Sequence, residues 1–150
     1  MRPPIFPIQT GGSQAQEYLH RAMQFRDAAM PLASYVNGQP NWPRIALLTH
    51  AIELALKAFV FHAVESGLHP EPAKPPYNHD LEGWYRLAVA YGLSSNPDLA
   101  ESISVLNKLH RPHFARYPQP ATFAVRGTDT VPDEVVEHLI SDLMPVIFPR

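Results

Sequence analysis

The chain contains no cysteine, which excludes a disulfide framework and a zinc site with thiolate ligands. It is also poor in charge. Only 17% of its residues are charged and the net charge is −2, so no overall basic field favours nucleic acid. It lacks an uninterrupted apolar run of about 18 residues, the length that suits a membrane span. Its N-terminus lacks the apolar segment of a signal peptide. We therefore expect a cytoplasmic protein with no membrane contact.

The chain contains enough apolar residues to form one globular core. Hydrophobic residues make up 45% of its 150 residues, a length typical of a single domain. We assign one domain to residues 1–150, with 1–13 as an extended N-terminal arm. The 17 prolines cluster between the periodic segments. Because proline is excluded from helix interiors, these clusters mark the gaps between helices.

Apolar residues recur at helical spacing in five segments, which cover residues 14–37, 42–66, 79–91, 97–110 and 132–147. Pro31 lies inside the first segment, where we expect a kink. The second segment is apolar on most sides, which predicts the central helix. The fold class is therefore all-α, an up-and-down antiparallel helical bundle. A long loop, residues 111–131, precedes the last helix, with a short extended piece possible at 122–125.

Glu53 and Lys57 lie one turn apart in the middle of the second segment, so both point to the same face. One reading is an ordinary solvated edge. However, the same face continues as apolar Val60, which favours partly buried charges, and buried charges must be paired. We expect Lys57 to form an ion pair with Glu53 or with Asp80, which opens the next helix. The structural ion pair is thus assigned to Glu53, Lys57 and Asp80.

Three stretches occur in a characteristic order: HAIELALKAFVFHAVESG at 50–67, HDLEGWYRLAVAYGL at 79–93 and RYPQP at 116–120. Together, over roughly residues 14–147, they resemble the HEPN superfamily of small helical bundles. The resemblance implies an antiparallel bundle that commonly dimerises. It also implies one of two activities. Many members are metal-independent ribonucleases of toxin–antitoxin or defence systems, and others bind RNA, nucleotides or partner proteins without cleaving them.

Catalytic members of that superfamily carry Arg-x4–6-His near the start of a late helix, where a cation holds the phosphate and an imidazole moves a proton. Arg44 and His50 match this spacing but lie in the second predicted helix, where the chain turns apolar and access to a phosphate is poor. Arg111 and His113 lie nearer the expected place with a different spacing. These four residues are the weak candidates for catalysis, and the departure favours a non-catalytic member.

Residues 102–128 contain neither Asp nor Glu and combine cations with aromatic side chains. Such a combination suits single-stranded RNA or a nucleotide. A helix end and a long loop are also common places for function. The candidate ligand-binding residues are Lys108, Arg111, Arg116, Tyr117 and Arg126. In the alternative interpretation these arginines pair with acids elsewhere, such as Glu53 or Asp133.

Two histidine pairs offer further candidate chemistry. His110 and His113 could share a helical face, but Pro112 separates them and no third ligand is evident, so we expect no metal site and no cofactor. His79 and Asp80 could form a catalytic pair. A helix start with a packed imidazole explains them more simply.

The sequence thus predicts an HEPN-like binding or regulatory module that does not catalyse a reaction. Its expected ligand is RNA, a nucleotide or an antitoxin-type protein partner, and its expected assembly is a homodimer. One alternative is an active metal-independent endoribonuclease, and a further alternative is a purely structural dimerisation module.

Overall fold

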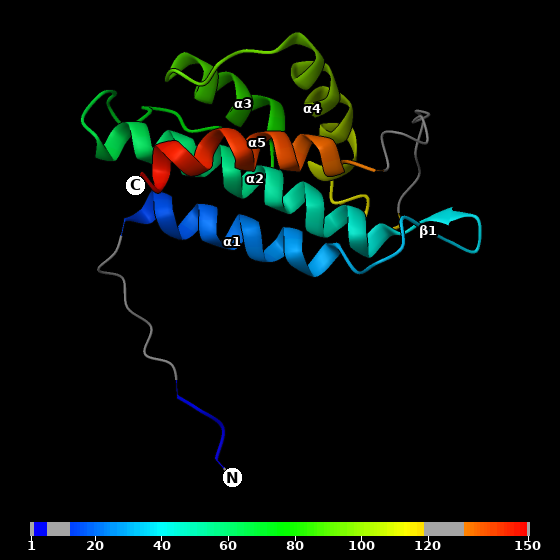
Figure 1. Cartoon of the computed structure of the whole chain (residues 1–150). Coiled ribbons are helices and arrows are strands. Elements are labelled where there is room, and N and C mark those ends of the chain that lie inside the picture. The colour runs from blue at the N-terminus through cyan, green and yellow to red at the C-terminus, as the bar shows by residue number, and fades with distance from the viewer. Residues whose placement is uncertain (1, 6–12, 119–130, 150) are drawn as a thin grey trace.

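The computed structural model describes residues 2–5, 13–118 and 131–149. These residues form a helical bundle with one small antiparallel hairpin (Figure 1). In chain order the elements are α1 (Gln14–Ala29), β1 (Tyr35–Val36), β2 (Gln39–Pro40), α2 (Trp42–Glu65), α3 (Leu81–Ala90), α4 (Pro97–His110) and α5 (Asp133–Ile147). The predicted all-α class is confirmed.

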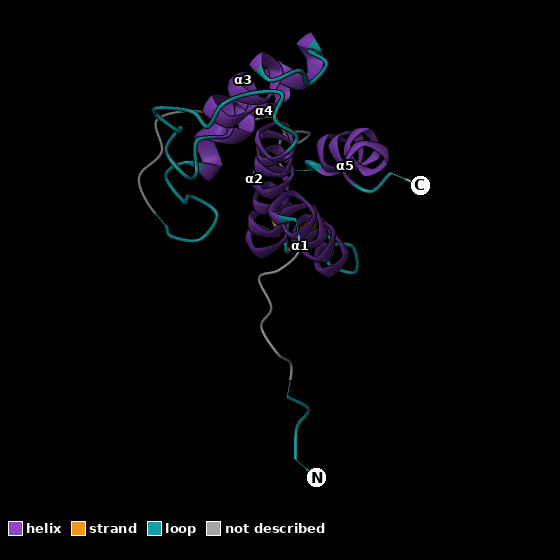
Figure 2. Cartoon of the chain, turned by 90° about the vertical axis from the view of Figure 1, so that its left-hand side faces the viewer, coloured by secondary structure: helices purple, strands orange, loops and turns teal. Residues whose placement is uncertain are grey.

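Helix α2 is the central helix, as its sequence predicts. It packs against each of the other four helices, and Figure 2 shows it end-on, between α1 on one side and α3 with α4 on the other. By length and composition, α2 could cross a membrane. However, 72% of its most apolar window is buried inside the bundle, as in the core helix of a soluble protein.

Helix α1 is shorter than predicted. It ends at Ala29 instead of running to residue 37 with a kink at Pro31. Proline has no N–H to continue the helical hydrogen bonds, so the chain leaves the helix there. Asn37 and Gly38 then adopt positive φ angles of 52° and 74°. This is the backbone that a two-residue hairpin turn requires, so these residues close a hairpin where the sequence suggested only a helix stop.

Asn and Asp side chains set the start of three helices. Asn41 accepts a hydrogen bond from the Arg44 N–H at the start of α2, and Asn96 accepts from two N–H groups at the start of α4. Asp80 opens α3 as predicted, and its carboxylate accepts a hydrogen bond from the Gly83 N–H at 3.1 Å. Such caps satisfy donors that have no partner within the helix.

The predicted long loop lies only partly among the described residues. Residues 111–116 form turns directly after α4, and α5 begins at Asp133 after Pro132. The predicted extended piece at 122–125 lies outside the described residues. In the predicted N-terminal arm, residues 2–5 are exposed without regular structure, and Ser13 caps α1.

Candidate functional site

The side chain of Glu53 lies at the centre of a buried polar network. Its Oε2 atom is 3.0 Å from Lys57 Nζ, and its Oε1 atom lies 2.9 Å from His110 Nε2 and 2.8 Å from His79 Nδ1. Glu53 is 2% exposed and Lys57 8%. Glu53 and Lys57 come from the central helix, whereas His110 ends α4 and His79 precedes α3. The network therefore joins three parts of the chain.

This network keeps Glu53 ionised. Burial alone would raise the pKa of the carboxyl group. The hydrogen bond from His110, the charge of Lys57 and the hydrogen bond from His79 more than offset that effect, and they lower the pKa of Glu53 to about 2. Glu53 is thus a carboxylate at neutral pH, and donors occupy both of its oxygens.

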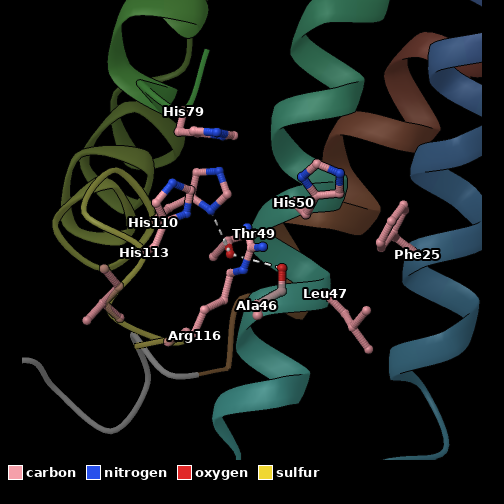
Figure 3. A pocket seen from close by; sticks show the side chains of 11 residues that line it. Phe25, Ala46, Leu47, Thr49, His50, His79, His110, His113 and Arg116 are labelled. Atoms are coloured by element: carbon pink, nitrogen blue, oxygen red, sulfur yellow. Dashed lines mark hydrogen bonds between the residues drawn. The ribbon is translucent and has the colours of Figure 1, made fainter. Parts of the chain in front are cut away.

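A pocket of about 270 Å³ opens beside the network. Four imidazoles line it together with Arg116 (Figure 3). His50 comes from α2, His79 from the segment before α3, His110 from the end of α4 and His113 from the turn that follows α4. The rings of His79 and His113 pack edge to face with centroids 4.4 Å apart. The fold therefore gathers histidines that are separated by as many as 63 positions in the chain, from 50 to 113.

The backbone of His113 places its ring at this pocket. Its φ angle is 58°, in the left-handed region that side chains other than glycine seldom occupy. The conformation follows directly from the turn after α4, in which the Phe114 N–H donates to the Leu109 carbonyl at 2.9 Å. A positive φ angle is common in the turn that ends a helix, and His113 occupies that position.

Two of the imidazoles favour the neutral form. Burial lowers the pKa of His50, with the positive charge of Lys57 among the smaller effects acting in the same direction, and the nearby Glu53 only partly opposes it. Burial, then the charges of His79 and Arg116, lower the pKa of His113. Neutral imidazoles can accept a proton or coordinate a metal ion.

The predicted catalytic pair Arg44 and His50 is divided between two environments. Arg44 is 5% exposed; its guanidinium binds both carboxylate oxygens of Asp133, one of them at 2.7 Å, and the Leu32 carbonyl at 3.0 Å. It therefore ties α5 to the start of α2. His50, by contrast, lines the pocket with 34% of its side chain exposed, although the sequence suggested that access there would be poor.

Asp80 lies apart from the Glu53–Lys57 pair with which it was grouped. Besides capping α3, its Oδ1 atom accepts a hydrogen bond from Asn107 at 2.9 Å, and its Oδ2 atom is 3.9 Å from Arg111 Nη1. Arg111 also lies over the ring of Tyr77. Arg111, a predicted catalytic candidate, therefore lies beside the α3 cap and is not among the residues that line the pocket.

The other predicted ligand contacts differ in position. Arg116 lines the pocket, with its guanidinium 5.8 Å from the ring centroid of Tyr117, which is 60% exposed. Glu53 takes its partners from Lys57 and two histidines, so the suggested Arg116–Glu53 pair is not among the ion pairs of the described residues. Lys108 is exposed on α4. Arg126 lies outside the described residues.

Sequence reasoning did not assign Thr49 or His79 to the site. Thr49 Oγ1 is 3.1 Å from His110 Nδ1 and 2.8 Å from the Ile45 carbonyl. No local pattern marks this threonine. His79 directly precedes the Asp80 cap, and that short motif was the available signal. Thr49 joins the network through the packing of α2 against α4, and His79 joins it because the segment before α3 lies against α2.

Comparisons with known proteins add no relative. The chain matches no protein-family model, no curated protein and no solved structure. The HEPN resemblance therefore stays a prediction that rests on the three quoted stretches of sequence.

Proposed function

We propose that the chain is a non-catalytic binding module of the HEPN type, and that its histidine-lined pocket holds a phosphate group of RNA or of a nucleotide. One observation carries the proposal: Arg116 and four imidazoles converge on one pocket, and none of the residues that line it is acidic. The nearby carboxylate of Glu53 already has three partners. The pocket thus presents donors and positive charge to an anion.

The size of the pocket limits the part of a ligand that can enter it. Its volume of about 270 Å³ is just below the range of about 300–1,000 Å³ typical of sites for drug-sized molecules. A phosphate with part of one nucleoside fits such a space. A base would then lie outside, where exposed Tyr117 beside Arg116 offers a ring for stacking.

Replacing Arg116 with alanine tests the proposal. We expect Arg116→Ala to weaken binding of a short single-stranded RNA and to reduce the slope of log K against log salt by ~0.7, the value for one lost phosphate contact. The melting temperature is expected to change little, because Arg116 is exposed. Fluorescence anisotropy at several salt concentrations measures both quantities.

Arg86→Ala is the matched control, because Arg86 is 71% exposed on α3 and pairs only loosely with Glu82 at 3.6 Å. The control is expected to bind like the wild type. Equal binding by the Arg116 variant and the wild type would contradict the proposed site. A lowered melting temperature would instead assign Arg116 a structural role.

The second candidate is a metal-independent endoribonuclease, and the neutral imidazoles favour it. RNA cleavage needs a base to accept a proton and a group to donate one. His50 and His113, with their lowered pKa values, suit the first role, and Arg116 could stabilise the phosphate. Cleavage of RNA in the presence of a chelator, abolished by His113→Ala or His50→Ala, would replace the binding proposal by this one.

We also propose a homodimer, which the HEPN resemblance implies. Four exposed apolar side chains lie at the end of α1 and in the hairpin: Met30, Leu32, Tyr35 and Val36. A symmetric partner would remove such a surface from water. Light scattering at micromolar concentration is expected to give twice the monomer mass of 16.8 kDa. Val36→Asp is expected to shift the protein toward the monomer, whereas a wild-type monomer would contradict the proposal.

The proposed setting is the cytoplasm, in a toxin–antitoxin or defence system with an antitoxin-type protein partner. This part rests on the resemblance alone. A neighbouring gene for a nucleotidyltransferase-type or other antitoxin, whose product copurifies with this chain, would support it. A dimer that binds neither RNA nor such a partner would favour the purely structural module.

A further inference from the structure

We propose a binding site for a divalent transition-metal ion beside the pocket, with His50, Glu53 and His110 as ligands, of which the two histidines also line the pocket. One ligand atom from each of these residues lies within 4.8 Å of the others. Two imidazoles and one carboxylate form a ligand set found in zinc enzymes, where solvent occupies the remaining position. The inference does not depend on the proposed binding of RNA or nucleotides.

The hydrogen bonds of His110 provide the first argument. Thr49 Oγ1 lies 2.8 Å from the Ile45 carbonyl, the nearer of its two carbonyl contacts, and a hydroxyl has a single hydrogen to donate. When that hydrogen goes to Ile45, His110 Nδ1 donates to Thr49 at 3.1 Å. His110 Nε2 then faces the Glu53 carboxylate at 2.9 Å. An imidazole nitrogen and a carboxylate oxygen in this position can bind one ion together.

The surroundings of the three residues also suit a metal centre. A metal-binding histidine usually donates its other N–H to a nearby acceptor, which fixes the orientation of the ring, and Thr49 is that acceptor for His110. His79 Nδ1 contacts Glu53 Oε1 at 2.8 Å and holds the carboxylate in place.

Lys57 is the charge that competes with the ion. Its Nζ atom lies 3.0 Å from Glu53 Oε2, so it occupies one carboxylate oxygen and repels a cation. Because of this contact, a variant without the Lys57 charge should change metal binding and anion binding in opposite directions. Lys57→Met removes the positive charge and retains an apolar chain of similar length. It is therefore expected to strengthen metal binding, although it would weaken the binding of an anion.

The experiment uses the full chain after treatment with a chelator. Zn²⁺ is titrated calorimetrically, and Co²⁺ is followed by the visible absorption that a low-coordinate cobalt site produces. We expect one ion per chain. His50→Gln is expected to lower the affinity more than about tenfold, since losing even a supporting group costs about 10- to 100-fold. Circular dichroism checks that the variant folds, and His110→Gln is the second ligand variant.

His20→Gln is the matched control, because His20 is exposed on α1 and does not line the pocket. It is expected to bind zinc as the wild type does. The proposal is overturned if the wild type binds no zinc, or if folded His50→Gln binds as tightly as the wild type. Lower affinity in Lys57→Met would equally contradict it. A wild type that binds RNA but not zinc would reject this inference and leave the proposed function standing.

Discussion

Replacing Glu53 with alanine is expected to lower the free energy of unfolding by about 3–5 kcal/mol, the usual cost of breaking a buried ion pair. Glu53 is 2% exposed and accepts hydrogen bonds from Lys57, His110 and His79. Its removal leaves an ammonium group and two imidazoles without their acceptor. Glu53→Ala therefore combines two destabilising effects, a cavity and unpaired buried donors. Urea denaturation of the wild type and the variant at neutral pH measures the difference.

Variants of Lys57 show how much of the stability comes from the Glu53–Lys57 ion pair and how much from the histidine contacts of Glu53. Lys57→Ala leaves Glu53 with two imidazole donors, so we expect a smaller loss than for Glu53→Ala. Lys57→Met is expected to be milder still, because its side chain fills the same apolar space. Glu17→Ala is the matched control: Glu17 forms an exposed i,i+4 pair with Arg21, and such pairs contribute about 0.3–0.5 kcal/mol. Wild-type stability in Glu53→Ala would show that the network does not stabilise the fold.

Local sequence patterns predicted most of the helices because each helix carries its own signals. Asn41 caps α2 and Asn96 caps α4, and both are followed by proline in the first turn. The apolar residues around α2 identified it as the core. The prediction failed where two local signals competed. After Ala29, an apolar stripe continued at helical spacing, but Pro31 and the Asn37–Gly38 turn determined the backbone.

The candidate site was harder to predict, because it is made by packing between helices. The spacing of Glu53 and Lys57 predicted their contact, since both lie on one helix. The approach of His110 to Glu53 depends instead on how α4 lies against α2, and nothing near either residue encodes it. The same holds for Arg44, whose partner Asp133 lies 89 positions away. A sequence motif suggested Arg44 and His50 as a pair. In the structure Arg44 binds Asp133, whereas His50 lines the pocket.

Acid unfolding offers a second large effect that depends on the same carboxylate. The pKa of Glu53 is lowered from 4.5 to about 2 in the folded chain, because His110, Lys57 and His79 outweigh the effect of burial. A carboxyl group with a lowered folded pKa stabilises the fold above its unfolded pKa. This stabilisation is lost as the pH falls toward the folded value. The difference between the two pKa values corresponds to about 3 kcal/mol.

We therefore expect the free energy of unfolding of the wild type to fall steeply between about pH 4.5 and 2. Glu53→Gln cannot titrate, so its curve is expected to start lower at neutral pH and to fall less across that window. The two curves thus converge by about 3 kcal/mol as the pH decreases.

Other acids with a lowered pKa, such as Asp133 beside Arg44, contribute equally to both proteins and cancel in the difference. The lowered pKa values of His50 and His113 also stabilise the fold at higher pH. The loss of that stabilisation begins near their unfolded pKa of 6.5, above the pH range in which Glu53 titrates. Parallel curves below about pH 4.5 would mean that the imidazoles and Lys57 do not hold Glu53 ionised, and the proposed charge network would then be wrong.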